Sequence, residues 1–401
     1  MLTIGLIKEG KVPADNRVAL TPAQCRWMNK NRPDIKIIVQ SSAGRCFTDA
    51  EYKAAGVEVK EDVQEADILL GIKEVPPAML IENKIYLFFS HTKKLQPYNR
   101  QMLQEIIRKK ITLIDYECLE HEDGTRIIGF GFFAGVVGAH NGMMAYGNKT
   151  GAFSLGRVGD AGTFQRLIHT YFGLKIPNIK IAVTGSGRVA HGLLEIMNLM
   201  GIHEVEPEDY VKRTFSYPVY VHLKGANLYQ PKDGSPYNRE HFHNHPHEYQ
   251  NLFRNYISHT DLLLNGVYWE EGIPRLFEME DMQQPHFRIQ TIADVTDDKN
   301  GSVPCNLGDS TIEYPVYGVD KNSLEKTAPY LPETVDVMAV GNLPNELPKD
   351  ASRYFGEQLI KYILADLIEG HSTVIDKATI VKNGILTEEY AYMKTYAGLA
   401  E

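Results

Sequence analysis

A glycine-rich turn between an expected strand and an expected helix constrains this chain more than any other feature. The apolar run Ile181–Val183 leads into the segment GSGRVA at 185–190, and an apolar-periodic stretch follows it. In such a turn the first glycine permits a sharp bend, the second lets a ligand approach the backbone, and Ala190 keeps the helix close to the strand. The helix N-terminus then presents its amides to an anion. The sequence therefore predicts a βαβ unit that holds a pyrophosphate through Gly185, Ser186, Gly187, Arg188 and Val189.

An acidic residue is expected about 20 residues after such a turn, where it bonds the adenosine ribose of a dinucleotide. Glu206 lies at that distance, at the end of the next expected strand. A carboxylate there favours the free 2′-hydroxyl of NAD, whereas the nearby Lys212 and Arg213 favour the 2′-phosphate of NADP. The cofactor prediction is therefore NAD or NADP, and a glycine-rich turn without a ligand is the alternative.

The same alternation of short apolar runs and amphipathic segments extends over both halves of the chain. In the first half, helices are expected at Pro22–Asn31, after the capping residue Thr21, and at Gln96–Lys110. Five strands are expected there, at Leu2–Ile7, Ile35–Val39, Ile68–Ile72, Ile85–Phe89 and Ile111–Ile114. In the second half, further strands are expected at Val219–His222, Leu262–Val267, Ile289–Val295 and Val335–Val340. This rhythm predicts an α/β fold with two Rossmann-like domains, parallel sheets and a cleft between the domains.

Two long helical segments set the expected domain borders. The stretch from Phe130 to Lys149 has the small and apolar spacing of a packed connecting helix, and the run from Ser352 ends at Gly370, a typical C-cap. The later helix is expected to return to the first domain. We therefore expect a substrate (catalytic) domain at 1–137 plus 341–401 and a dinucleotide-binding domain at 138–340.

Charge and cysteine content exclude several classes of protein. Lys and Arg number 42 against 51 Asp and Glu, so the formal net charge is −9 and nucleic acid is an unfavourable partner. The four cysteines show no metal-ligand spacing, and the N-terminus reaches Lys8 and Glu9 too soon for a signal peptide or a membrane span. The expectation is a cytoplasmic protein without a membrane partner, either a monomer or a homo-oligomer.

A histidine-rich segment at 241–247 raises the question of a metal. Alternating histidines point to opposite sides of an extended segment, no cysteine is near, and Asn244 and Pro246 are turn formers. We therefore expect a surface loop and no metal.

Ionisable residues gather after the expected strands of the first half. The pairs Lys8-Glu9, Lys73-Glu74 and Ser90-His91 each follow an apolar run, as do Asp15 with Arg17 and Asp115 with Glu117. Taken singly, each is most simply a solvated strand end. Ligands of open parallel sheets bind outside the carboxyl ends of the strands, so together these residues predict one pocket for a zwitterionic substrate with several carboxylates. A Lys and a His in such a pocket are suited to general acid and base chemistry.

Acidic residues also follow an expected strand of the second half. Asp294, Asp297 and Asp298 lie at the end of Ile289–Val295, a strand end that would border the reactive ring of a nicotinamide. An acid there could stabilise a cationic intermediate. The same residues are equally good turn formers.

With these residues assembled, the chain resembles the superfamily of alanine dehydrogenase and lysine-forming saccharopine dehydrogenase over essentially its whole length. The more specific resemblance is to the lysine-ketoglutarate reductase domain of bifunctional aminoadipic semialdehyde synthase. It is carried by RVALTP at 17–22, GIKEVPP at 71–77, FFSHTKK at 88–94, LIDYE at 113–117, GFGFFAGVVG at 129–138, NGVYWEEGIPRL at 265–276 and NLPNELPKDAS at 342–352.

The resemblance implies the reversible, NAD(P)-dependent formation of saccharopine from L-lysine and 2-oxoglutarate, through an imine. It implies that Lys73 and His91 act as acid and base, and that Arg17 and Arg126 hold substrate carboxylates. The remaining substrate contacts that it implies are Asp15, Glu74, Lys94 and Glu117. On the cofactor side it implies Asp298, Asn342 and Leu343, beside the glycine-rich turn and Glu206. The implied partners are small amino acids and 2-oxo acids.

One position departs from the pattern. Relatives that handle saccharopine carry an acid just before the NLP-like motif, whereas this chain has Gly341, as alanine dehydrogenases have a small residue there. An alanine-dehydrogenase-like or other opine-type amino-acid dehydrogenase is therefore the first alternative. A nicotinamide-binding sensor without turnover is the second.

Overall fold

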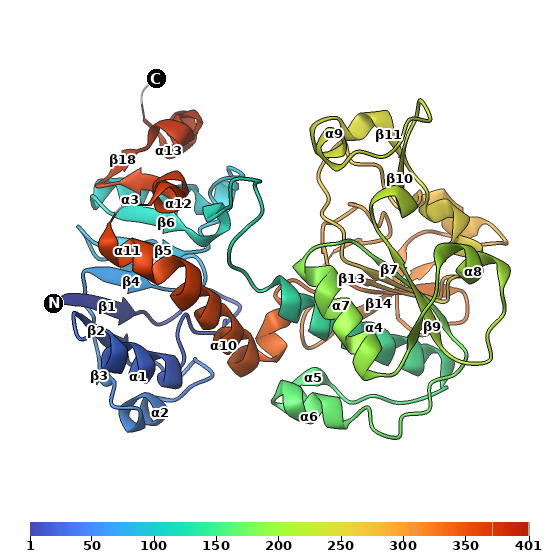
Figure 1. The fold of residues 1–401 in the computed structure, drawn as a ribbon, viewed down its shortest axis with the longest axis horizontal. Helices are drawn as coiled ribbons and strands as arrows, with labels where there is room; N and C mark the ends of the chain where they lie inside the picture. The colour runs from blue at the N-terminus through green and yellow to red at the C-terminus, as the bar shows by residue number, and fades with distance from the viewer. Residues whose placement is uncertain (309, 371, 400–401) are drawn as a thin grey trace. The chain divides into compact units, whose positions relative to one another are not determined.

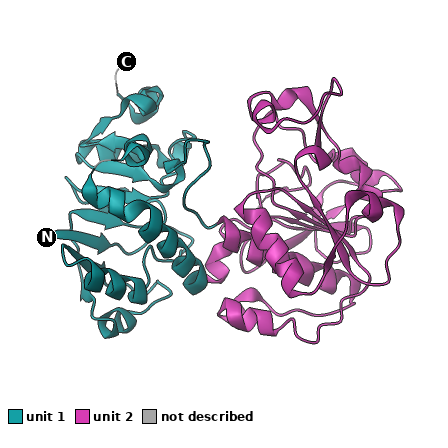
Figure 2. Cartoon of the chain, viewed as in Figure 1, with its two compact units in different colours: residues 1–130, 348–401 teal, residues 131–347 magenta. Residues whose placement is uncertain are grey.

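The computed structural model describes residues 1–308, 310–370 and 372–399, which form two compact units (Figure 2). Unit 1 comprises Met1–Phe130 with Pro348–Glu401, and unit 2 comprises Gly131–Leu347. The borders differ from the expected 137 and 341 because the whole connecting helix α4 (Gly131–Thr150) and the turn Leu343–Glu346 belong to unit 2. The functional roles expected of the two domains stay predictions.

Unit 1 is built on an eight-stranded sheet in the order β18-β17-β6-β5-β4-β1-β2-β3. Its strands from β1 to β6 are mutually parallel, whereas β17 runs antiparallel to β6 and pairs with β18. Figure 1 shows these C-terminal strands completing a sheet made by the N-terminal part of the chain. The strand bounds are β1 Leu2–Leu6, β2 Ile35–Gln40, β3 Glu58–Lys60, β4 Ile68–Leu70, β5 Ile85–Phe88, β6 Thr112–Asp115, β17 Thr379–Lys382 and β18 Ile385–Leu386.

Of the two helices expected in the first half, one begins at its expected cap, whereas the helix expected from Gln96 begins only at Arg100, after a 3₁₀ turn at Pro97–Asn99. The first helix starts at Pro22, after Thr21, and Thr21 and Gln24 form a reciprocal capping box. The expected long C-terminal helix is interrupted by a π-helical turn at Ile360–Leu364 and ends at Gly370, whose φ is 76°. The helices are α1 Pro22–Asn31, α2 Asp49–Ala54, α3 Arg100–Arg108, α10 Pro348–Leu359, α11 Ala365–Glu369, α12 Thr373–Ala378 and α13 Lys394–Ala397.

Unit 2 is built on a second eight-stranded sheet, in the order β15-β14-β16-β13-β12-β7-β9-β8. The six strands β16, β13, β12, β7, β9 and β8 are parallel to one another. Strands β14 and β15 form an antiparallel edge. The strand bounds are β7 Lys180–Thr184, β8 His203–Glu204, β9 Val219–Leu223, β12 Leu262–Asn265, β13 Thr291–Asp294, β14 Val316–Asp320, β15 Lys326–Thr327 and β16 Thr334–Met338. The α/β prediction with two Rossmann-like domains is confirmed, but both sheets are mixed rather than wholly parallel.

The helices of unit 2 pack on this sheet, and a small hairpin stands apart from it (Figure 1). Where α4 crosses α7, Gly135 and Gly192 face each other so closely that a side chain on either would collide with the backbone of the other helix. The helices are α4, α5 Val158–Ala161, α6 Phe164–His169, α7 Arg188–Leu199, α8 Pro207–Lys212 and α9 Arg239–Asn244. The hairpin joins β10 (Tyr229–Pro231) to β11 (Tyr249–Asn251).

The histidine-rich segment is not the irregular surface loop that the sequence predicts. It forms α9 and a 3₁₀ turn at Pro246–Glu248, so the rings of His241 and His245 lie on one face, 4.8 Å apart between centroids. Residues 1–308, 310–370 and 372–399 contain no group of three or more His, Cys, Asp or Glu side chains arranged to hold a metal ion.

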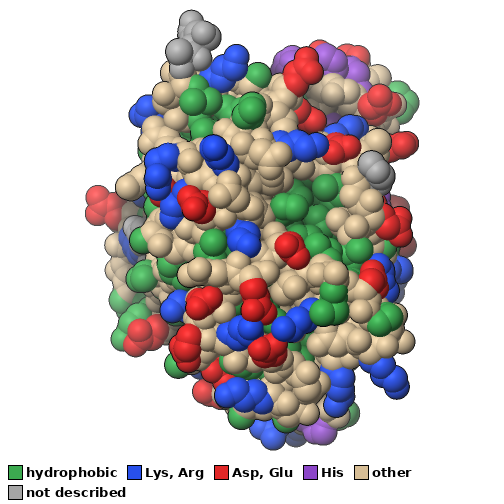
Figure 3. All heavy atoms as spheres, turned by 90° about the vertical axis from the view of Figure 1, so that its left-hand side faces the viewer, with side chains coloured by type: hydrophobic (Ala, Val, Ile, Leu, Met, Phe, Trp, Pro, Cys, Tyr) green, Lys and Arg blue, Asp and Glu red, His purple; other side chains and the backbone are tan. Residues whose placement is uncertain are grey.

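The surface carries charges of both signs. On the face in Figure 3, Lys and Arg side chains alternate with Asp and Glu around a small hydrophobic group, without a broad field of one sign. Within the described part of the chain, no helix has the length and apolar character needed to cross a bilayer.

Candidate functional site

The turn after β4 places Lys73 over a buried carboxylate. Glu9, from the loop after β1, accepts hydrogen bonds from the backbone N–H groups of Ile72 at 2.7 Å and Lys73 at 2.9 Å. Burial raises the pKa of Glu9 to about 7, although these two bonds oppose the shift. The sequence includes Glu9 among the strand-end residues of the predicted pocket but assigns it no role of its own.

Lys73 itself has an electrostatic environment suited to proton transfer. Burial and the neighbouring positive charge of Arg17 lower its pKa to about 8, against the attraction of Asp15. An ammonium group with such a pKa exchanges its proton close to neutrality, which an ordinary surface lysine does not do.

Arg17 is held in a fixed orientation beside Lys73. Its Nε donates to the carboxylate of Asp15 at 2.9 Å, its Nη2 donates to the other oxygen, and both side chains are buried. The guanidinium carbon also lies 4.1 Å from the centre of the Phe130 ring. Burial of Asp15 is outweighed by these bonds, so its pKa is lowered. Asp15 thus orients Arg17, whereas the sequence assigns both residues to the substrate.

His91 is oriented by Glu74 across two strand ends. The Nδ1 atom of His91, after β5, lies 2.7 Å from Oε1 of Glu74, after β4, and the Nζ of Lys11 lies 2.7 Å from Oε2. Burial would raise the pKa of Glu74, but the bonds to His91 and Lys11 lower it to about 2. Glu74 is therefore a carboxylate at all ordinary pH values, and it leaves Nε2 of His91 for other partners.

A small pocket of about 200 Å³ opens beside this histidine. Three of its lining residues, His91, Lys94 and Glu117, are predicted for the site by the sequence. The other three, Lys11, Gln96 and Tyr98, are not. Arg126, which is predicted to bind a substrate carboxylate, donates from Nη2 to Oε1 of Glu117. It is therefore paired with an acidic side chain of the pocket wall. The missed residues lie in the loops after β1 and β5, where the strand-end rule could have found them.

A buried carboxylate behind the pocket ties its two loops together. Asp115 accepts from the backbone N–H of Ser90 at 3.1 Å and from that of Glu117 at 2.7 Å. Burial raises its pKa to about 6, against the hydrogen bond from Ser90. Asp115 therefore positions the loops that carry His91 and Glu117.

In unit 2 the glycine-rich turn has the geometry that the sequence predicts. Gly185 has a φ of 102°, and a Cβ on it would lie 2.4 Å from the carbonyl oxygen of Gly266, so no other residue fits. A Cβ on Gly187 would meet no atom within 4 Å, and Ser186 and Gly187 are exposed at the N-terminus of α7. This exposed backbone at a helix start fits a pyrophosphate.

The residues expected to read the adenosine ribose follow β8, which is not the strand beside β7. Glu206 caps α8 after β8, which is the edge strand, two strands from β7. Lys212 and Arg213 form ion pairs with Glu208 and Asp209 at the end of α8. The Nζ of Lys180, the first residue of β7, donates to the carbonyl oxygen of Arg213 at 2.9 Å. Arg213 therefore lies at the amino end of β7, about 13 Å of strand away from the glycine-rich turn, which gives no support to a contact between Arg213 and a 2′-phosphate.

Carboxylates cluster after β13, as expected, but they differ in exposure. Asp294 is fully buried and accepts from the side-chain amides of Asn265 and Asn306, each at 2.8 Å. Burial raises the pKa of Asp294 to about 7 and that of Asp297 to about 6. Asp298 is half-buried. The Oδ2 atom of Asp297 lies 3.1 Å from where a Cβ on Gly341 would be.

The two residues after Gly341 point in different directions. Asn342 is partly exposed and has a φ of 75°, which begins the turn Leu343–Glu346. Leu343 is 1% exposed, so its side chain belongs to the core, and any cofactor contact at this position would come from its backbone.

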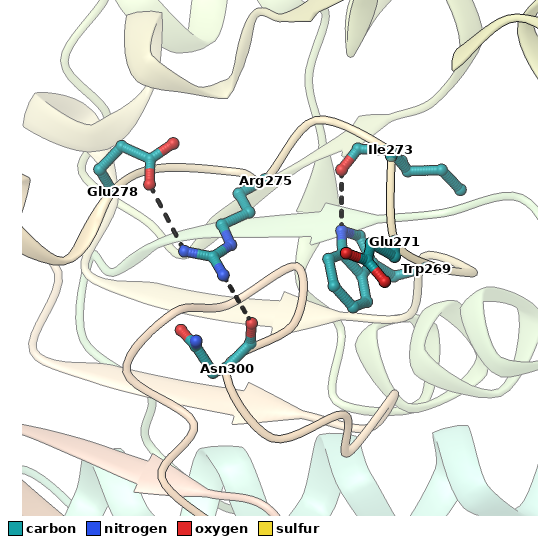
Figure 4. Close-up of a pocket in the computed structure, with 7 residues that line it drawn as sticks. Trp269, Glu271, Ile273, Arg275, Glu278 and Asn300 are labelled. Carbon is teal, nitrogen blue, oxygen red and sulfur yellow. Dashed lines mark hydrogen bonds and ion pairs between the residues drawn. The ribbon is translucent and has the colours of Figure 1, made fainter. Parts of the chain in front are cut away.

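A larger pocket, of about 580 Å³, lies between the loops that follow β12 and β13. Figure 4 shows Arg275 between Glu278 and Asn300, with its Nη2 donating to the carbonyl oxygen of Asn300 at 3.0 Å. The Trp269 indole donates to the carbonyl oxygen of Ile273 at 2.9 Å and forms another wall. The motif at 265–276 contributes to the family resemblance, but the sequence analysis does not predict a site there.

Comparison with known proteins agrees with this architecture. The family model of the alanine dehydrogenase/PNT N-terminal domain matches residues 5–137. The mitochondrial alpha-aminoadipic semialdehyde synthase of Mus musculus is 30% identical over an aligned length of 433 residues, covering 95% of this chain and 46% of the relative. The saccharopine dehydrogenase (NAD(+), L-lysine-forming) of Yarrowia lipolytica is 23% identical, covering 88% of this chain and 89% of the relative.

Solved structures show the same fold. An L-alanine dehydrogenase superposes with a TM-score of 0.66 at 17% identity, covering 98% of this chain and 99% of that one. A transhydrogenase from Sinorhizobium meliloti superposes with a TM-score of 0.61 at 14% identity, covering 96% of this chain and 100% of that one. Residues 5–137 thus match the alanine dehydrogenase/PNT N-terminal domain, and most of the chain is similar to a lysine-forming saccharopine dehydrogenase and to about half of a semialdehyde synthase. The chain spans about half the length of the semialdehyde synthases that it matches.

Proposed function

We propose that this chain is an NAD(P)-dependent oxidoreductase that forms or cleaves saccharopine, with L-lysine and 2-oxoglutarate on the other side of the reaction. The observation that carries the proposal is the pairing of two proton-transfer groups in unit 1. Lys73 has a pKa lowered to about 8, and His91 is fixed by a carboxylate at 2.7 Å from its Nδ1. The names of the relatives, which are dehydrogenases and semialdehyde synthases, support the same chemistry.

The cofactor requirement is supported by the residues of unit 2. The backbone of Gly185, Ser186 and Gly187, with Arg188 and Val189 at the start of α7, would hold the pyrophosphate. Asp298 and the backbone of Asn342 and Leu343 would border the nicotinamide end. The bound nicotinamide supplies or takes up the hydride.

Proton transfers fall to the residues of unit 1. During synthesis, the amine of lysine adds to the ketone of 2-oxoglutarate, and Nε2 of His91 protonates the carbinolamine hydroxyl so that it leaves as water. A hydride then adds to the carbon of the resulting imine, which gives the secondary amine. In the reverse direction neutral Lys73 removes the proton of that amine as the hydride leaves. Arg17, oriented by Asp15, and Arg126 would hold carboxylates of the substrate.

The pocket in unit 1 supports a substrate with several charges. Lys11 and Lys94 supply positive charge, and Glu117 supplies negative charge, around about 200 Å³. This mixture suits an amino acid that carries both an ammonium and carboxylates better than it suits an apolar substrate.

The first experiment follows the oxidation of NADH and of NADPH by absorbance, with 2-oxoglutarate and lysine, ornithine, alanine or ammonia in turn. Pyruvate with ammonia forms a separate arm. We expect lysine-dependent oxidation with 2-oxoglutarate. Activity only with pyruvate and ammonia would contradict the proposal and favour an alanine-dehydrogenase-like enzyme.

A variant separates catalysis from binding. Lys73→Met should abolish turnover while leaving the affinity for reduced nicotinamide nearly unchanged, because Lys73 is in unit 1 and the glycine-rich turn is in unit 2. Lys53→Met, at an exposed position of α2, is the matched control and should be fully active. Wild-type turnover in Lys73→Met would contradict the mechanism, and cofactor binding without turnover for any substrate would favour a sensor.

A further inference from the structure

The last part of unit 1 contacts the loop that carries His91. It consists of a 3₁₀ stretch, Glu388–Met393, and the helix α13, and we call these residues the C-terminal strap. Helix α13 packs against α3, the helix that follows the loop (Figure 1). The loop runs from His91 to Gln96, between β5 and the 3₁₀ turn at Pro97–Asn99, and both of its end residues line the pocket of unit 1.

Two tyrosine hydroxyls of the strap hold the backbone of this loop. Tyr392 donates to the carbonyl oxygen of Lys93 at 3.0 Å, and Tyr396 donates to the carbonyl oxygen of Gln96 at 2.5 Å. In return, Nε of Arg100, at the start of α3, donates to the carbonyl oxygen of Tyr396 at 2.9 Å. The strap therefore binds the loop on both sides of Leu95.

The strap is itself anchored in the core of unit 1. Met393 and Ala397 are buried, and the buried Tyr390 donates from its hydroxyl to the carbonyl oxygen of Lys377 at 2.8 Å. The two tyrosines that reach the loop alternate with these buried residues along the strap. Their hydroxyls are therefore presented to the loop from a fixed base.

The backbone conformation of the loop needs such support. His91 has a φ of 49° and Leu95 a φ of 54°, both in the left-handed region. Histidine is enriched in this region, whereas a bulky residue such as leucine is rarely found there. A backbone held in this way costs free energy and persists only where the surrounding structure enforces it. The two tyrosine hydrogen bonds flank Leu95, so they are placed to enforce it.

The loop carries two groups that the proposed reaction uses. His91 is oriented through its side chain by Glu74, 2.7 Å from its Nδ1. Lys94, which lines the pocket, stands between Lys93 and Leu95, directly beside a carbonyl group that the strap binds. A loop that leaves its place would therefore move Lys94 more than His91.

We propose that the C-terminal strap fixes the pocket loop for substrate binding, with Tyr392 and Tyr396 as positioning residues that place Lys94. The proposal rests on the proposed function, because it assumes that this pocket binds saccharopine or the compounds that form it. It adds a dependence of activity on two side chains that are not among those lining the pocket.

Steady-state kinetics of the full chain provide the first test. Tyr392→Phe and Tyr396→Phe remove one hydroxyl each and should each lower kcat/KM for saccharopine roughly two- to tenfold. The double variant should lose more, chiefly through a higher KM, while its affinity for reduced nicotinamide stays unchanged because the glycine-rich turn is in unit 2. Tyr362→Phe, at an exposed position of the π-helical turn, is the matched control and should be fully active.

Amide hydrogen exchange provides a second test that does not depend on turnover. In the double variant the amides of residues 92–96 should exchange faster than in the wild type. The amides of β5 and β6, which lie in the sheet, should exchange at the wild-type rate and show that unit 1 is folded.

A substitution at Leu95 separates positioning from a general loss of packing. Asparagine tolerates the left-handed region better than leucine does, so Leu95→Asn makes the loop less dependent on the strap. The double tyrosine variant should therefore lose less kcat/KM in the Leu95→Asn background than in the wild-type background. An equal loss in both backgrounds would contradict the proposal.

The outcomes separate this proposal from the proposed function. Wild-type exchange in the double variant, or faster exchange with an unchanged KM, would overturn the positioning role and leave the proposed function standing. A wild-type chain without lysine-dependent turnover would overturn the proposed function and the placing of Lys94 with it. The exchange rates would then still decide whether the strap holds the loop.

Discussion

The crossing of α4 and α7 is the most demanding contact in unit 2, and it supports the helix that begins at the glycine-rich turn. A Cβ on Gly135 would lie 2.0 Å from the carbonyl oxygen of Val189 and 2.9 Å from the Cα of Gly192. Both neighbours are backbone atoms and cannot rotate away. Gly135→Ala therefore forces the two helices apart by about 1 Å before ordinary contact distances are restored.

The cost can be estimated from two opposing effects. Overpacking a well-filled interface costs about 1–3 kcal/mol, and the rigid backbone on both sides places this site at the upper end. Alanine in place of glycine in a helix interior recovers about 1 kcal/mol. We expect unit 2 to lose about 2 kcal/mol, which for a unit of this size lowers its melting temperature by about 4–8 °C.

The assay must report on unit 2 alone, and the chain offers a simple means. It has two tryptophans, of which Trp27 lies on α1 in unit 1 and Trp269 packs against the core of unit 2. In a Trp27→Phe background, tryptophan fluorescence during urea unfolding follows unit 2. Dinucleotide affinity is measured on the same samples, and it should fall because Val189 and the start of α7 must move.

Gly159→Ala is the matched control, since Gly159 lies in α5 of the same unit and a Cβ there would meet no atom within 4 Å. It should be neutral or stabilising by up to about 1 kcal/mol. If Gly135→Ala were as stable as Gly159→Ala and bound dinucleotide normally, the reasoning about the helix crossing would be refuted.

Three further predictions concern the chemistry. The kcat/KM for saccharopine oxidation should rise as the pH passes through about 8, because neutral Lys73 is the base, and a profile flat across this range would contradict that role. Because the folded-state pKa of Glu74 is depressed, its charge stabilises the fold above pH 4.5 and this contribution is lost as the pH falls towards 2, so the stability deficit of Glu74→Gln in urea should shrink over that range. Asp297→Ala should reduce kcat at least tenfold, and adding Gly341→Asp should restore much of it, because both carboxylates reach one space; failure of the second substitution to help would count against this equivalence.

Local patterns predicted the elements of unit 1 well because their signals are local. The capping residue Thr21, followed by Pro22, marks the start of α1, and apolar runs bounded by polar residues mark β1, β2, β4, β5 and β6. The strand-end rule also anticipated that residues from separate loops would meet. Glu74 and His91 are an example, since Oε1 of Glu74 lies 2.7 Å from Nδ1 of His91 although the residues are 17 positions apart in the sequence.

Pairing between distant segments could not be predicted in the same way. No sequence pattern indicates that β14 and β17 run antiparallel to the strands they pair with. Their direction depends on which edge of the sheet is available for pairing. The role of Glu9 was not predicted because it depends on hydrogen bonds to the turn at Lys73 and on burial, neither of which a single sequence shows. The expected cleft and the roles of individual site residues stay predictions.

Sheet order had the largest chemical consequence. Counting residues from the glycine-rich turn leads to Glu206, because it assumes that the next strand in the sequence is also the next strand in the sheet. The insertion of β9 between β7 and β8 breaks this assumption, because the backbone end of β9 is hydrogen-bonded to the turn instead. The strand, turn and helix of the motif could be predicted from the sequence, but which strand end lies beside the turn depends on topology.

The same distinction between sequence position and position in space bears on the substrate. Gly341 departs from relatives that handle saccharopine, because they carry an acid there, and on sequence alone this weakens lysine as the amine. Asp297, from the loop after β13, places its carboxylate 3.1 Å from where the side chain of residue 341 would begin. We therefore propose that Asp297 supplies the carboxylate that the resemblance leads one to expect at position 341. Gly341 is therefore no argument against saccharopine unless the carboxylate of Asp297 proves dispensable.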